Sequence, residues 1–398
     1  MGCRCPRSRS SPRCTASPSR CSNCPPGGLA DAIGRRPVLV ASAVAGAGGL
    51  LLLGLADTIA LFLASAVLRG IARALSTGPL EAWYVDTVHA HAGRDVDLTG
   101  GLARGEVAGS LALAVGTLTG GLLPLVLDGT DTLPALAVPV LAAAGVEVLR
   151  ALVTARLAEP PHPRPKLAAV VRHVPATVVA GLQVSARDRA LTRVLLAAGG
   201  AGIALGTIEL LTPAWLADLT GGPTAAATYA VVAAAGFGAD AVGGMIAGWV
   251  VRSCGSHARA AATGVVVSAL SLLGLAGCAL LRGPGAMALA GLAYCLLFVG
   301  LGAAFPAQAK LLHDRVEATE RATVLSVQSL VMQVLGAVGL PLIGWQATRH
   351  GIEAGYLLGA AVLFASAALF VRLPATAPHA AAGTPPSMGE YADERRVP

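Results

Sequence analysis

The sequence has 398 residues, of which 55% are hydrophobic and only 13% are charged. Soluble domains carry about 25% charged residues, so the composition excludes an ordinary soluble enzyme. The formal net charge of +7 does not indicate nucleic-acid binding, because the basic residues lie between apolar runs of about 20 residues, the length that spans a bilayer. We therefore predict an all-α polytopic membrane protein with no nucleic-acid partner.

Residues 1–26 differ from the rest of the chain, because they hold five of its eight cysteines together with many Arg, Ser and Pro residues. The pairs Cys3/Cys5 and Cys21/Cys24 have the spacing of metal ligands. A disordered basic tail is a second interpretation. A third is a non-native segment, because GC-rich DNA read out of frame encodes these residue types. We favour the last two and expect neither a metal nor a cofactor.

The next stretch, residues 27–39, combines glycines and charges in a fixed spacing: Gly27, Asp31, Gly34, Arg35 and Arg36. Glycines permit a tight reversal and close helix approach. The charged side chains can interact with the dipoles of neighbouring helix ends. A long apolar run follows at once, so the stretch is typical of a loop between two membrane helices.

Apolar segments of membrane length then recur to the end of the chain. We predict helices over residues 38–56, 59–80, 101–127, 134–157, 191–216, 225–251, 260–281, 284–308, 322–345 and 352–372. A polar connection at 158–190 begins with four prolines, which end the preceding helix. Apolar positions within 166–186 then recur at helical spacing, which indicates an interfacial helix.

The loop at 27–39, followed by these segments, resembles motif A of the major facilitator superfamily, with Ala32 where the family usually has a basic residue. The resemblance covers about 27–373 and implies a two-bundle transporter fold. By this comparison about 10 of 12 transmembrane helices are present, and helix 1 and most of helix 2 are not found before Gly27. The family pairing further implies that Arg35 meets Asp86, or Glu81 as second choice, in a gating latch.

These segments define the expected domains. Residues 27–157 form an incomplete amino-terminal bundle, 158–190 a central loop, 191–373 a six-helix carboxy-terminal bundle and 374–398 a disordered tail. Loops on the side of motif A hold most of the basic residues, so this side and the tail are predicted to be cytoplasmic. Lysine occurs only at Lys166 and Lys310, and this bias towards arginine is typical of GC-rich bacterial genes. The predicted location is the bacterial inner membrane.

Two membrane segments carry further family-like patterns. Arg69 resembles the arginine of motif B, which the family associates with proton coupling, whereas snorkelling is the simpler interpretation of Arg73. Gly116, Gly120 and Gly121 resemble motif C of proton-driven antiporters, with Thr117 where the family has proline. Close packing of small residues is an equally good explanation of these glycines.

Acidic residues inside apolar segments are the other candidates. Asp240 and Glu209 lie in the predicted helices 225–251 and 191–216, and a carboxyl group in such surroundings is a candidate proton or cation site. A satisfied structural role is the alternative. Glu147 has Arg150 three residues later, which predicts a pair within one helix.

The sequence therefore predicts a monomeric secondary transporter in the lipid bilayer, not an enzyme. The expected activity is proton-coupled efflux of drug-like small molecules. Uptake of a small solute is an alternative within the class, and a non-transporting, truncated membrane protein is the alternative outside it.

Overall fold

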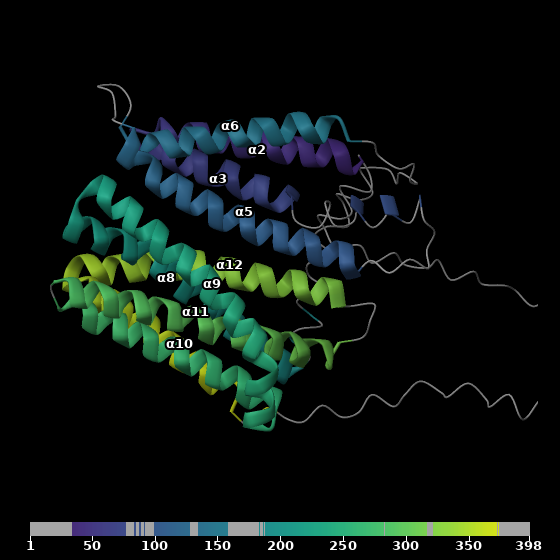
Figure 1. Cartoon of the computed structure of the whole chain (residues 1–398). Helices are drawn as coiled ribbons and strands as arrows, with labels where there is room; N and C mark the ends of the chain where they lie inside the picture. The colour runs from purple at the N-terminus through teal and green to yellow at the C-terminus, as the bar shows by residue number, and fades with distance from the viewer. Residues whose placement is uncertain are drawn as a thin grey trace, which may run out of the picture.

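The computed structural model describes residues 34–76, 83–84, 87–88, 91, 99–127, 134–157, 183, 186, 188–281, 283–316, 321–371 and 373. Ten helices and no strand occur in this part of the chain (Figure 1). The helices are α2 (Arg35–Gly54), α3 (Ile59–Ser76), α5 (Thr99–Val126), α6 (Ala137–Ala155), α8 (Arg189–Thr220), α9 (Gly222–Cys254), α10 (His257–Ala279), α11 (Pro284–His313), α12 (Arg321–His350) and α13 (Ile352–Ala368).

Each predicted membrane segment corresponds to one of these helices. Eight are long and apolar enough to cross a membrane, and shorter apolar stretches occupy Leu111–Val126 of α5 and the whole of α13. A helix satisfies its own backbone hydrogen bonds, which is why it is the element that apolar runs adopt in lipid. The predicted fold class, an all-α polytopic membrane protein, is confirmed.

The second half of the chain holds the hydrophobic core. Its buried residues run from Leu191 to Phe370. Helices α10 and α11 pack together, as do α9 with α11, α8 with α12 and α10 with α13. Small residues allow the closest crossing: a Cβ atom added to Gly264 of α10 would lie 2.5 Å from the carbonyl oxygen of Gly300 in α11. Ser268 joins the same two helices by donating to the carbonyl of Leu297 at 2.8 Å.

In the first half, α2 packs against both α3 and α6, and a polar network connects the three helices. The Ser42 hydroxyl donates to the carbonyl of Ala72 at 2.8 Å, and Arg150 Nη2 donates to Ser42 Oγ at 3.3 Å. Arg150 also forms an ion pair with Glu147 at 2.6 Å, so the predicted pair within the helix is confirmed. The network holds α2 between α3 and α6 around Ser42, two turns into the helix.

Helix α5 packs mainly against α9, and so brings the first half into contact with the second (Figure 1). The contact is tight at Gly121, where an added Cβ would clash with the Ala230 side chain and lie 2.8 Å from the Ala226 carbonyl oxygen. Towards the beginning of α5 the packing is open, because a Cβ at Gly105 or Gly109 would meet nothing within 4 Å. The described halves therefore touch near the end of α5.

Candidate functional site

A cavity lies where α5 meets the second half. Its volume is about 600 Å³, within the range of ~300–1,000 Å³ typical of small-molecule sites. The lining comes from helices α5, α8 and α9 and from the residue just before α6. It consists of Gly116, Thr117, Gly120, Gly121, Leu136, Pro213, Ala214, Ala217, Ala225, Ala226, Tyr229 and Ala230. Among the residues that the structure describes, this lining is apolar except for the hydroxyls of Thr117 and Tyr229 and includes no charged side chain.

Helix α8 brings a carboxylate close to this cavity. Glu209 is exposed and lies one turn before Pro213, which lines the cavity. A proline inside a helix has no N–H to donate to the carbonyl four residues earlier, so Pro213 cannot satisfy the carbonyl of Glu209. The residue therefore offers two oxygen acceptors, its carboxylate and its carbonyl, beside the cavity.

Tyrosines from two other helices complete these surroundings. Tyr229 of α9 lines the cavity, and its phenol group interacts with that of Tyr294 of α11. The charge of Glu209 interacts electrostatically with both phenol groups. The Tyr294 ring centroid lies 5.2 Å from that of Phe298, and Phe298 makes an edge contact with Phe237 at 6.2 Å. One carboxylate thus lies beside a cluster of aromatic rings.

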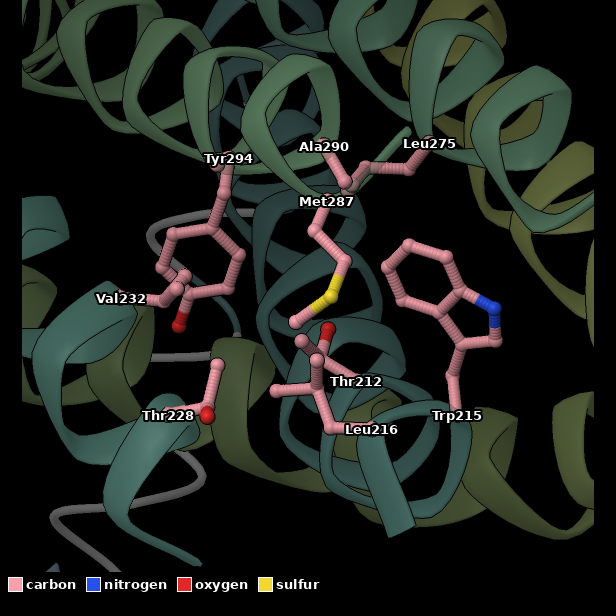
Figure 2. A pocket seen from close by; sticks show the side chains of 10 residues that line it. Thr212, Trp215, Leu216, Thr228, Val232, Leu275, Met287, Ala290 and Tyr294 are labelled. Atoms are coloured by element: carbon pink, nitrogen blue, oxygen red, sulfur yellow. The ribbon is translucent and has the colours of Figure 1, made fainter. Parts of the chain in front are cut away.

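A second, much smaller pocket lies behind Tyr294 among α8, α9, α10 and α11 (Figure 2). Its volume of about 20 Å³ is enough for a single water molecule. The side chain of Met287 lies between the Tyr294 and Trp215 rings, and Thr212 faces the same space (Figure 2). Thr212 also shares a hydrogen bond of 2.9 Å with the buried Tyr356 of α13.

Asp240, the other acidic candidate, lies in α9 where this helix crosses α11. A Cβ added to Gly302 of α11 would be 2.9 Å from Asp240 Oδ1. The residue as a whole is exposed. Asp240 is therefore on the same helix as Tyr229 but does not line the cavity.

The motif A residues are described only in part. Gly34 is buried and adopts φ 111° immediately before α2, a backbone conformation that favours glycine. Arg35 and Arg36 are the first two residues of α2, half-buried and exposed respectively. Gly27, Asp31 and Asp86 lie outside the described residues, so the Arg35–Asp86 latch stays a prediction.

Of the remaining candidates, the motif C glycines line the cavity and Arg69 does not. Gly116, Gly120 and Gly121 all line it, but only Gly121 is in tight contact with α9. Arg69 is exposed on α3, and its backbone packs closely against Gly49 of α2. Arg69 is not part of the cavity lining, so the structure brings the motif C glycines together with α8 and α9 but not with Arg69.

Residue-by-residue sequence reasoning missed Tyr229 and Tyr294. A usable signal existed, because the chain has only five tyrosines and three of them, Tyr229, Tyr294 and Tyr356, lie in apolar helices. A phenol hydroxyl in an apolar segment needs a hydrogen-bond partner. The sequence alone does not show that Tyr229 of α9 and Tyr294 of α11 are neighbours in the fold.

Comparison with known proteins identifies the family. Residues 22–336 match the family model described as Major Facilitator Superfamily, whereas no curated protein sequence matches the chain. A mutant of the nucleoside transporter NupG is similar in structure, with a TM-score of 0.66 and 13% identity over 87% of this chain and 86% of that one.

Transporters of the POT family are also similar in structure. One, solved in complex with 5-aminolevulinic acid, has a TM-score of 0.60 and 14% identity over 87% of this chain and 82% of its own. Another, in complex with a thioalcohol-conjugated peptide, has a TM-score of 0.57 and 13% identity over the same shares. At these identities the likeness concerns the fold, whereas the family model matches most of the sequence. The chain belongs to the major facilitator superfamily of transporters.

Proposed function

We propose that the protein is a secondary active transporter that exports hydrophobic, drug-like small molecules in exchange for protons. The observation that supports this most strongly is the cavity of about 600 Å³ between α5 and helices α8 and α9. Its lining is apolar, and it lies at the contact between the two halves, which in transporters of this architecture move against each other around a central site. Apolar walls favour substrates that leave water readily.

Proton coupling is assigned in this proposal to Glu209 and Asp240, with Arg69 as a third candidate. Ionisable side chains in membrane helices are costly and mark ion pathways by default. Glu209 lies one turn from the cavity lining, and Asp240 lies on α9 beyond the lining residue Tyr229. Protonation of either carboxylate can therefore change the charge of the second half near the cavity. The resemblance of Gly116, Gly120 and Gly121 to motif C favours exchange over uptake.

The proposal also includes an orientation. The protein is taken as a monomer in a bacterial inner membrane, with the loop before α2 and the carboxy-terminal tail in the cytoplasm, because basic residues concentrate on that side. A charged latch between Arg35 and Asp86 would stabilise one state of the transport cycle. Uptake of a polar solute is the second candidate, since one solved structure of similar fold is named as a nucleoside transporter.

Transport into liposomes containing the purified full chain tests the proposal. A panel of neutral and permanently charged fluorescent dyes avoids the passive trapping of weak bases. With an acidic lumen, exchange with outgoing protons should accumulate dye above the level in protein-free liposomes. Glu209→Gln or Asp240→Asn should lower this rate by about tenfold or more while leaving the binding of a neutral dye nearly unchanged.

Glu353→Gln is the matched control, because Glu353 lies in the first turn of α13, away from the cavity lining. Accumulation only with an alkaline lumen would instead indicate proton symport, the uptake alternative. If no dye moved in either gradient, the non-transporting alternative would be favoured. Normal coupling in both single variants would remove Glu209 and Asp240 from the proton pathway and leave Arg69 as the candidate.

A further inference from the structure

The α5 wall of the cavity presents a single side chain. Helix α5 contributes Gly116, Thr117, Gly120 and Gly121 to the lining, and three of these residues are glycines. A Cβ atom added at Gly116 would meet nothing within 4 Å, so this wall is open beside Thr117. Thr117 stands where motif C has proline, and its side chain therefore brings to the wall a hydroxyl group that a proline ring does not have.

The hydroxyl group of Thr117 is not used within the helix. Threonine in a helix can donate to the carbonyl four residues earlier. Four others in this chain do so at 2.8 to 2.9 Å: Thr119, Thr207, Thr220 and Thr228. Half-buried Thr117 has no hydrogen bond to any described residue. Because an unpaired hydroxyl in apolar surroundings is costly, this group is available to a ligand in the cavity.

The other walls consist mostly of small apolar side chains. Among the described residues, α8 and α9 contribute five alanines, Ala214, Ala217, Ala225, Ala226 and Ala230. The one aromatic ring of the lining belongs to Tyr229, whose phenol group already interacts with that of Tyr294. Small side chains leave room for a rigid ring system, which can pack against the Tyr229 ring. The hydroxyl of Thr117 is then the polar group that can orient such a ligand.

We propose that the cavity binds apolar ring systems that carry a hydrogen-bond acceptor such as a ketone, with the Thr117 hydroxyl donating to the acceptor and Tyr229 packing against the rings. This inference rests on the proposed function, because it names the substrate class of the same cavity. Thr117 acts here as a specificity-determining residue. A carbonyl that leaves water for an apolar cavity loses its hydrogen bonds, and the hydroxyl replaces one of them. A hydrocarbon of the same shape leaves the hydroxyl unpaired.

Fluorenone and fluorene test the inference, because these tricyclic molecules have nearly the same shape but only fluorenone has a carbonyl. Their equilibrium binding to the purified full chain is measured without any pH gradient, after subtraction of binding to empty detergent micelles. Fluorenone should bind about fivefold more tightly, a gain typical of one neutral hydrogen bond. Thr117→Val, which keeps the shape and removes the hydroxyl, should abolish this preference, whereas Thr117→Ser should retain it.

Thr119→Val is the matched control. Thr119 lies on the same helix, but its hydroxyl donates to the Val115 carbonyl and it is outside the described lining, so the preference for fluorenone should be unchanged. Equal binding of the two compounds to the wild type, or tighter binding of fluorene, would overturn the inference, and this comparison stands even if Thr117→Val does not fold.

A preference for fluorenone that survives in folded Thr117→Val protein would also overturn the inference, because the hydroxyl would then not be its source. The outcome is separate from that of the transport proposal. Gradient-driven dye movement by a protein that binds fluorenone and fluorene equally would refute this selectivity while leaving the transport proposal intact.

Discussion

Replacing Gly121 with leucine should severely impair dye transport without unfolding the second half of the protein. The physical reason is space, because even a Cβ atom at this position would clash with Ala230 and would lie 2.8 Å from the Ala226 carbonyl oxygen. A backbone oxygen cannot rotate away as a flexible side chain can, so α5 and α9 must separate. Transport should fall by at least about tenfold, since misplacement of about 1 Å is costly for a positioned site.

Gly109→Leu is the matched control for this variant. Gly109 lies in the same helix, but a Cβ there would meet nothing within 4 Å, so transport should be retained. The measurement is the initial rate of dye accumulation in liposomes, alongside thermal unfolding to verify folding. Full activity of the Gly121→Leu protein would show that the α5–α9 contact is not needed for transport.

The second large effect concerns stability. Gly264→Leu should destabilise the second half by at least about 3 kcal/mol, the upper range for overpacking in a well-packed interior. A Cβ at Gly264 would lie 2.5 Å from the Gly300 carbonyl oxygen and 3.0 Å from the Ala304 side chain. The leucine would therefore force α10 and α11 apart and break the hydrogen bond from Ser268 to the Leu297 carbonyl.

Unfolding of the purified protein by increasing SDS in mixed micelles measures this change. Gly277→Leu, in the same helix, is the control, because a Cβ at Gly277 meets nothing within 4 Å. Its free energy of unfolding should differ from that of the wild type by less than about 1 kcal/mol. Similar losses in the two variants would mean that glycine content in α10, and not the crossing with α11, determines stability.

Much of the fold could be predicted from the sequence because membrane helices follow from local hydrophobicity. The segment predicted at 352–372 is α13, Ile352–Ala368, and the one predicted at 59–80 is α3, Ile59–Ser76. The Glu147–Arg150 pair was equally accessible, because its two residues are three apart in one helix. Each of these features depends only on residues close together in the chain.

Contacts between distant segments were not predictable in this way. The clash that makes Gly121 special comes from Ala226 and Ala230, about a hundred residues later, and nothing in Gly116, Gly120 or Gly121 themselves distinguishes the last from the others. The same holds for the partnership of Tyr229 with Tyr294. Glu209 was recognised as a candidate from its apolar context, but its aromatic neighbours required the packing of α8, α9 and α11.

If substrate binds in the cavity between α5 and the second half, it should shield a thiol introduced into the cavity wall. In a cysteine-free background, Thr117→Cys places a thiol in the cavity lining. Leu122→Cys places one on the same helix at an exposed position, 43% accessible, outside the lining. We expect the best transported dye to slow maleimide labelling at position 117 but not at 122. Unchanged labelling at 117, or equal protection at both positions, would show that the substrate does not bind in this cavity.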